Sequence, residues 1–171
     1  HFFGNDPYSR FHYEATHAAL DTGATPRPSR QRNRRTVVLD LKQPYELIWK
    51  THYSSTNRNM IRKGASTLTY TISQAKQEID QFFVMYIDTM SRIGADSFYF
   101  FSKEFFDNLL TILSDECFVF TAFDANSQKP IGGLLLLVYE GKAHYFLAAR
   151  SNSCSNNSMN NYLLDQAVKF A

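Results

Sequence analysis

Three apolar segments that follow one another with very short connections are the strongest constraint on the fold. They span residues 117–124, 130–139 and 143–150, and each has the length and apolar content of a buried strand. Residues 125–129 join the first to the second, and residues 140–142 join the second to the third. Connections this short join antiparallel neighbours, because a parallel pair needs a crossover of a dozen or more residues. The sequence therefore predicts an antiparallel three-strand meander.

The residues before this meander predict one strand followed by two helices. Residues 67–72 alternate hydroxyl and apolar side chains, as half-buried strands do. Ser73 is expected to cap a helix that Gly94 ends, and Ser102 is expected to cap a second helix with an apolar stripe. After the meander, a loop rich in serine and asparagine leads to a last helix over 161–171. This order of elements is typical of an α+β layered domain, in which helices flank a sheet.

The N-terminal part of the chain is organised differently. Residues 1–35 are expected to be irregular and to end in a basic connector. The domain is expected to span 36–171 and to be incomplete at its C-terminus, because an amphipathic pattern still continues at the last residue. Within the domain, residues 36–41 predict a short strand. A single helix is predicted from Pro44 to Gly64, since proline suits a helix start and glycine a helix end.

Composition excludes several classes of protein. Of the 171 residues, 44% are apolar, which is enough for a sizeable core. No apolar run approaches the roughly 20 residues of a membrane span, so no integral membrane segment is expected. Cys117 and Cys154 make no metal-binding spacing with the scattered histidines, so neither a metal site nor a permanently bound cofactor is expected. Cys117 is expected to be a buried free thiol, which favours a reducing, cytoplasmic location.

Positive charge is concentrated in one part of the chain. Residues 27–63 hold ten lysines or arginines and two acidic residues, a local charge of +8. The remainder holds eight cations and fourteen acids, a charge of −6. Such asymmetry predicts contact with an anion. Nucleic acid, a nucleotide-linked substrate and an anionic lipid headgroup all fit this prediction.

Three of these cations, Arg58, Arg62 and Lys63, lie at the predicted end of the helix that stops at Gly64. Their i, i+4, i+5 spacing is expected to place them on one side of the last turn, and Asn59 is a further candidate for binding substrate. Two interpretations remain open. The residues form a solvated helix end whose cations complement the helix dipole, or they form a docking surface for phosphate.

Four segments, taken in order, resemble the FemAB-like branch of the GNAT acyltransferases, which includes the peptidoglycan-bridge aminoacyltransferases. The order of predicted elements also resembles the first two-thirds of the GNAT fold. In the second segment Gly64 replaces the alanine usual in that branch. The segments are residues 36–50, 56–64, 130–145 and 160–171.

The resemblance implies an N-acyltransferase that adds an aminoacyl or acyl group to an amine of a bacterial cell-envelope precursor, such as one of peptidoglycan or polysaccharide. Aminoacyl-tRNA is then the expected donor. The expected partners are tRNA and an anionic nucleotide- or lipid-linked precursor, with the protein in the cytoplasm at the inner face of the membrane. One alternative is an acyl-CoA-dependent GNAT N-acetyltransferase, and a second is a non-enzymatic nucleic-acid-binding module. The oligomeric state is left open.

The choice of donor depends on one loop. In GNAT enzymes proper, backbone N–H groups of a glycine-rich loop hold the pyrophosphate of acyl-CoA before the helix that follows the third meander strand. The corresponding loop here, residues 150–160, contains no glycine. Because glycine allows the closest approach of backbone to ligand, this difference disfavours acyl-CoA.

Two neighbouring residues, His144 and Tyr145, are the candidates for catalysis. They are expected where the third strand meets the loop, pointing to opposite faces of the sheet. Histidine can accept the proton of an attacking amine near neutral pH. The other interpretation is a histidine that is only hydrogen-bonded within the sheet.

The last predicted helix begins with Asn160 and Asn161. Both are expected to cap this helix, and Asn160 is also a candidate substrate contact. Further along, Asp165 and Lys169 have the i, i+4 spacing of a surface ion pair.

Overall fold

The structure is a computed structural model that describes residues 37–171. It divides into two compact units, with the division between Ser54 and Ser55. The irregular segment and basic connector predicted for residues 1–35 lie outside the described residues. The domain boundary predicted at residue 36 therefore stays a prediction.

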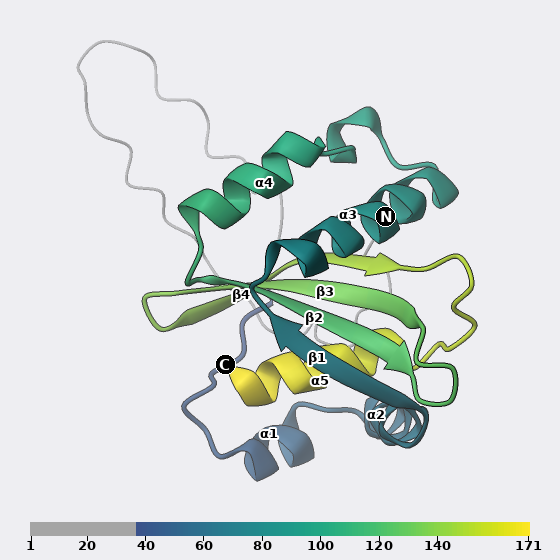
Figure 1. Ribbon diagram of the computed structural model, residues 1–171. Coiled ribbons are helices and arrows are strands. Elements are labelled where there is room, and N and C mark those ends of the chain that lie inside the picture. The colour runs from purple at the N-terminus through teal and green to yellow at the C-terminus, as the bar shows by residue number, and fades with distance from the viewer. Residues whose placement is uncertain (1–36) are drawn as a thin grey trace, which may run out of the picture. The chain divides into compact units, whose positions relative to one another are not determined.

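The first unit contains one short helix, α1, which spans Tyr45–Thr51 (Figure 1). Pro44 precedes it, as predicted, and the N–H groups of Leu47 and Ile48 donate to the Pro44 carbonyl at 2.9 and 3.2 Å. The strand predicted at residues 36–41 is wrong for the residues that the structure describes, because residues 37–41 form no strand. A β-branched sequence is stable as a strand only when a neighbouring strand pairs with it, and no described strand does so here.

The single helix predicted from Pro44 to Gly64 is also wrong. Helix α1 ends at Thr51, and a second helix, α2, runs over Ser55–Thr67 in the other unit. The residues between them include His52 and the first of two serines, types with low helix propensity. The break thus lies among residues of low helix propensity.

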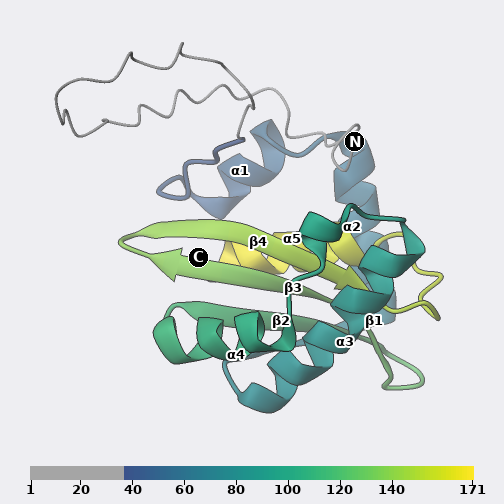
Figure 2. The ribbon, with the colours of Figure 1, turned by 90° about the horizontal axis from the view of Figure 1, so that it is seen from above.

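The second unit is an α+β domain, as predicted. Its four strands form one antiparallel sheet in the order β1-β2-β3-β4, so the predicted meander is confirmed and β1 pairs with its first strand. Helices α3 and α4 cover one face of the sheet, and α2 and α5 lie on the other (Figures 1 and 2). The remaining elements are β1 (Leu68–Ser73), α3 (Lys76–Arg92), a 3-10 turn (Ser97–Tyr99), α4 (Lys103–Ile112), β2 (Cys117–Asp124), β3 (Pro130–Tyr139), β4 (Lys142–Arg150) and α5 (Met159–Phe170).

Two adjacent glycines in β3 allow helices to approach the sheet closely from both sides. A Cβ at Gly132 would lie 2.3 Å from Cε of Met159 in α5, and a Cβ at Gly133 would lie 2.8 Å from a ring carbon of Phe82 in α3. Successive strand residues face opposite sides, so one glycine serves each helix. Cys117 is a fully buried free thiol, as predicted, and burial raises its pKa to about 11.

The predicted helix signals have mixed outcomes. The Ser102 hydroxyl accepts a hydrogen bond from the Phe105 N–H at 3.2 Å and caps α4, as predicted. Gly94 follows the end of α3 with a φ of 60°, as predicted. Ser73 does not cap α3, because Ala75 holds that position and the Ser73 hydroxyl instead accepts from the Ala75 N–H.

The ion pair predicted between Asp165 and Lys169 is present, with 2.6 Å between Oδ2 and Nζ. The prediction that it lies on the surface is wrong, because Asp165 is fully buried. The spacing of two residues in a helix predicts that they pair. It does not predict whether they are buried, because burial depends on how the helix packs. The Gln166 side-chain amide also donates to the same carboxylate oxygen, at 3.2 Å.

Candidate active site

The end of β4 continues into a loop that the Arg150 side chain holds in a compact shape. Its guanidinium donates to the carbonyl of Cys154 from Nε at 3.2 Å and from Nη2 at 2.7 Å. Nη2 also lies 3.4 Å from Oδ1 of Asn157. At the start of the loop, the Ser151 N–H donates to the carbonyl of Ile131 in β3 at 2.9 Å. Residues 150–157 therefore have a defined conformation even though they contain no glycine.

Helix α3 fixes the strand side of this loop through one partly buried hydroxyl. Thr89 Oγ1 accepts a hydrogen bond from the Arg150 N–H at 2.9 Å. The Arg150 carbonyl lies 3.0 Å from Thr89 Oγ1 and accepts from Nη2 of Arg92, also at 3.0 Å. Both backbone groups of the last β4 residue are thus bonded to the C-terminal half of α3, and the position of the loop depends on that helix.

Helix α2 contacts the other side of the loop. The Asn156 side-chain amide donates to Thr67 Oγ1 at 3.0 Å. The Ser158 hydroxyl lies 3.8 Å from the sulfur of Met60. Helices α2 and α3, which lie on opposite faces of the sheet, therefore both contact the segment that joins β4 to α5.

Three backbone N–H groups of the loop donate to acceptors within the loop itself. The N–H of Ser153 donates to Oγ of Ser151 at 3.3 Å, and the N–H of Cys154 donates to the Ser151 carbonyl at 3.0 Å. The N–H of Ser158 donates to Oδ1 of Asn156 at 2.9 Å. A pyrophosphate would have to displace these acceptors to bind there.

The first turn of α5 is the place where the predicted caps were expected. Ser158 occupies the N-cap position and α5 begins at Met159, so the prediction that Asn160 and Asn161 cap the helix is wrong. Met159, the first residue of the helix, is buried and packs against Gly132 of β3. Asn160 is exposed on the first turn, where the helix dipole favours an anion. Its role as a substrate contact stays a prediction.

Gly64 lies inside α2 rather than after its end, which corrects the predicted position of the basic residues. The helix continues to Thr67, so no cation occupies its last turn. A Cβ at position 64 would lie 2.5 Å from Cβ of Tyr162 in α5, so the glycine permits close helix packing and does not terminate the helix. The interpretation of Arg58, Arg62 and Lys63 as a helix-end cap is therefore wrong.

The structure also separates these cations into two groups. Met60 and Thr67 contact the loop. Lys63 lies three residues after Met60 and four residues before Thr67, so these three residues share one flank of α2. At about 100° per residue, Arg58 and Arg62 lie on the opposite flank. Arg62 Nη1 donates to Oδ1 of Asn59 at 3.3 Å. The role of Arg58, Arg62 and Lys63 in binding a phosphate stays a prediction.

His144 and Tyr145 lie near the start of β4 and not at the loop, so the predicted position is wrong. The six residues from His144 to Arg150 span about 20 Å of strand. His144 is exposed, with its ring centroid 6.0 Å from that of Phe146, whereas Tyr145 packs on the α5 side of the sheet. Their opposite orientation is as expected, and their catalytic role stays a prediction.

A β-bulge interrupts β4 between these residues and the loop. Leu135 pairs with Leu147 while Leu136 pairs with Tyr145, so Phe146 is the additional residue. As a result Phe146 and Leu147 both pack on the α3 side. Bulges redirect side chains and are frequent beside active sites, so this part of β4 is a candidate position for a reacting group.

Other features of the described residues offer no alternative site. A shallow depression of about 410 Å³ lies beside α4 and includes Lys76 and Asp107, but none of the predicted site residues lines it. Residues 37–171 contain no cluster of three or more side chains suited to a metal ion. Within the same range, no helix combines the length and apolar character that crossing a membrane requires.

Residues 52–171 match a protein family described as an acetyltransferase (GNAT) domain. The match covers 120 of the 171 residues, which is well over half of the chain. The chain belongs to the GNAT acetyltransferase family. It is therefore an acyltransferase, and its strand order is consistent with part of the GNAT fold. No curated protein matches the chain significantly.

Sequence reasoning missed the residues that organise this GNAT loop. Thr89 lies within an amphipathic helix pattern, and Arg92 and Arg150 read as ordinary charged residues at the ends of elements. Asn156 is one of several asparagines in a polar loop. Their common feature is contact across long sequence separations, which no local pattern indicates.

Proposed function

We propose that this GNAT chain is an N-acyltransferase of FemAB-like type that uses aminoacyl-tRNA to modify an amine of a cell-envelope precursor. The observation that supports this donor is the loop before α5. It contains no glycine, and its Ser153, Cys154 and Ser158 N–H groups already donate within the loop. Three N–H groups at the place where GNAT enzymes bind the pyrophosphate of acyl-CoA thus already have acceptors within the chain, which supports a donor that does not depend on this loop.

The basic residues of α2 are assigned to two anionic groups. Lys63, on the flank of α2 that contacts the loop, would bind a phosphate of the donor near the start of α5, together with Asn160. Arg58 and Arg62, with Asn59, would bind the diphosphate of a nucleotide- or lipid-linked acceptor at the inner face of the membrane. Guanidinium groups suit this role because they form paired, charge-assisted hydrogen bonds with phosphate oxygens.

The reaction requires the amine nitrogen to attack the ester carbonyl carbon of the donor. A C–N bond forms, the C–O bond to the tRNA ribose breaks, the amine loses a proton and the ribose hydroxyl gains one. His144 would accept the amine proton, with Tyr145 as the other candidate, and one positioned base accelerates such a step by roughly a hundredfold or more. Positioning both substrates along the bulged edge of β4 supplies the larger contribution.

The proposal is tested by supplying labelled aminoacyl-tRNA or labelled acetyl-CoA to the purified chain, with lipid-linked or nucleotide-linked precursor as acceptor. Transfer from the tRNA donor alone would support the proposal. Transfer from acetyl-CoA alone would overturn the donor assignment and favour the acyl-CoA alternative. Binding of tRNA that weakens steeply with salt, without transfer from either donor, would favour the nucleic-acid-binding alternative.

A pair of charge variants tests the role of α2. Arg58→Gln/Arg62→Gln is expected to raise the KM for the acceptor at least tenfold. The matched control, Lys129→Gln/Lys142→Gln, removes the same charge from the turns at the two ends of β3 and is expected to leave KM unchanged. Equal effects of the two double variants would mean that only overall charge matters.

A further inference from the structure

Strand β1 forms one edge of the four-stranded sheet. It pairs with β2 without interruption from Leu68, opposite Asp124, to Ser73, opposite Val119. No other strand of residues 37–171 pairs with β1, so its outer side carries no partner strand within that range. Figure 1 shows β1 as the outermost strand of the sheet.

This edge lacks the features that usually prevent strand-to-strand association. Residues 68–73 contain no charge, no proline and no glycine, and their register with β2 has no bulge. By contrast, β4 carries Lys142, His144 and Arg150 and is bulged at Phe146. Natural proteins protect edges with such charges and bulges, so an unprotected edge indicates a surface where a strand binds.

The backbone groups that point outward follow from one hydrogen bond. The Ala125 N–H donates to the Thr67 carbonyl at 3.0 Å, which makes this a hydrogen-bonded pair of the β1–β2 ladder. Hydrogen-bonded and non-hydrogen-bonded pairs alternate, so Thr69 and Thr71 also direct their backbone groups to β2. Tyr70 and Ile72 consequently direct their N–H and C=O groups to the open edge.

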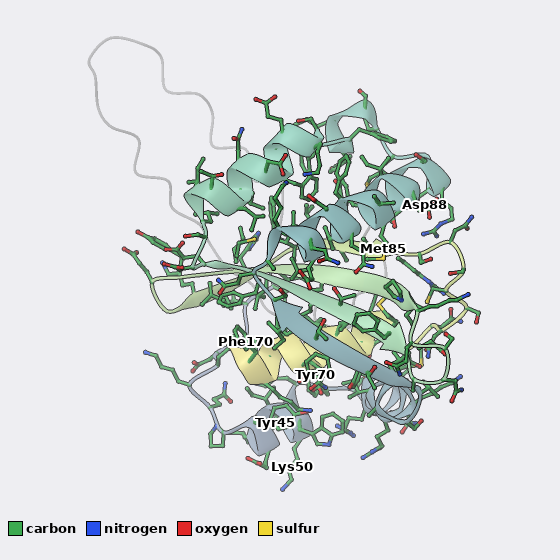
Figure 3. The ribbon with its side chains drawn as sticks, in the orientation of Figure 1. Tyr45, Lys50, Tyr70, Met85, Asp88 and Phe170 are labelled. Carbon is green, nitrogen blue, oxygen red and sulfur yellow. The ribbon has the colours of Figure 1, made fainter. Side chains whose placement is uncertain are left out.

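The side chains of β1 alternate between the two faces of the sheet, with apolar side chains on one face and hydroxyl side chains on the other. Tyr70 stacks on Phe120 with 6.5 Å between ring centroids and meets Tyr162 of α5 edge-on at 5.9 Å. Figure 3 shows Tyr70 on the α5 side of the sheet. Tyr70 and Ile72 still expose 37% and 36% of their surface, which leaves an apolar ledge on this face. The exposed Thr69 and Thr71 face the α3 side.

We propose that β1 pairs with β1 of a second copy of this chain, antiparallel and centred on Thr71. In this register Thr71 lies opposite Thr71 of the other copy, Tyr70 opposite Ile72, and Thr69 opposite Ser73. Hydroxyl side chains meet on one face and apolar side chains on the other. Tyr70 and Ile72, which direct their backbone groups outward, form the hydrogen-bonded pairs, so each outward N–H and C=O finds a partner. The two sheets join into one continuous sheet.

A second copy suits this edge because the segment is complementary to itself. The alternation Thr-Tyr-Thr-Ile-Ser over residues 69–73 keeps its pattern when reversed about Thr71. A strand shifted by one residue would place Tyr70 opposite a threonine and turn its side chains to the wrong face. The absence of charge means that two identical strands meet without repulsion.

Engineered cysteines test this register in the full chain. Thr71→Cys would place two thiols in a non-hydrogen-bonded pair with Cα atoms about 4.5 Å apart, which is within disulfide range. Rapid formation of a disulfide-linked dimer is expected. Thr69→Cys alone is the matched control and is expected to remain unlinked, whereas a mixture of Thr69→Cys and Ser73→Cys is expected to cross-link. The native cysteines are both buried and do not interfere.

Charge variants test the interface without a covalent bond. Sedimentation should show a dimer for the wild type, monomers for Thr71→Lys and for Thr71→Glu, and a restored dimer when the two variants are mixed. Val84→Lys adds the same charge at an exposed site on α3 and should leave the dimer intact. A wild type that stays monomeric at all concentrations overturns the proposal. So does a Thr71→Cys chain, folded by circular dichroism, that cross-links no faster than Thr69→Cys.

Discussion

Gly64 of α2 packs directly against Tyr162 of α5, with only 2.5 Å between the position of a Cβ at residue 64 and the Tyr162 Cβ. Both residues are buried. The two helices therefore approach each other more closely than any residue with a side chain would allow. Because α5 follows the loop of the candidate site, this contact also determines where α2 lies beside that loop.

Replacing Gly64 with alanine is expected to destabilise the protein. Helix propensity alone would stabilise the variant by about 1 kcal/mol. Overpacking at the helix contact is expected to exceed this gain and to lower the free energy of unfolding by about 1–3 kcal/mol. Urea unfolding measures the difference. Ala65→Gly, at the exposed neighbouring position, should lose only the propensity term, and a stabilised Gly64→Ala protein would contradict the packing argument.

Two threonine-to-valine variants are expected to have opposite effects. Thr121 is buried in β2, and its hydroxyl has no hydrogen-bond partner among the described residues. Valine should leave stability unchanged or raise it by about 1 kcal/mol, because no bond is lost and an unpaired polar group is removed. Thr89→Val is the matched control and should cost about 1–3 kcal/mol, since it leaves the Arg150 N–H without its acceptor. Equal losses in urea unfolding would contradict this assignment.

The ion pairs between α3 and α4 predict a specific loss of stability in acid. Hydrogen bonds from Lys103 and then Lys76 hold the pKa of Asp107 below its usual value. The unfolded chain therefore binds protons more readily, and the contribution of Asp107 is complete above about pH 4 and disappears as the pH falls through the lower, folded pKa. Asp107→Asn should be less stable than the wild type at pH 7, with the difference shrinking as the pH falls through the folded pKa of Asp107.

The control for this pH dependence is Asp115→Asn. Asp115 is exposed and has no lysine partner among the described residues. Its substitution should leave the acid limb of the unfolding free energy nearly unchanged. If Asp107→Asn lost stability equally at pH 7 and at pH 2, its effect would not arise from the ion pairs.

Arg150→Lys is expected to loosen the loop without unfolding the domain. Lysine cannot reproduce the two bonds from the guanidinium to the Cys154 carbonyl. A hydrogen bond from a charged group contributes about 1.5 kcal/mol or more, so amide exchange at Cys154 should become at least about tenfold faster. Lys142→Met, at the other end of β4, should leave that exchange unchanged. Unaltered exchange in Arg150→Lys would show that the loop holds its shape by other contacts.

Much of the sheet was predictable because its determinants are local. Short turns after 117–124 and 130–139 permit only antiparallel neighbours, and the alternation at 67–72 identifies a strand within one residue of β1. Ser102 and Gly94 act within a few residues of their own helices, so their effects could be predicted.

The predictions from sequence were wrong where a residue's role depends on a residue far away in the chain. Gly64 looked like a helix end, but it is a glycine because Tyr162 occupies the space of its side chain. Residues 37–41 have strand propensity but no neighbouring strand with which to pair. His144 was expected at the loop, yet the bulge and the length of β4 separate it from that loop.

By itself, the sequence determined the α+β class, the meander and the concentration of positive charge, because turn length, side-chain alternation and charge are properties of neighbouring residues. The tertiary structure decided which groups contact the β4–α5 loop, that Asp165 is buried, and that Gly64 packs against Tyr162 instead of ending a helix. These outcomes depend on how helices pack on the sheet. Packing is determined by contacts between residues far apart in the chain, which no local pattern records.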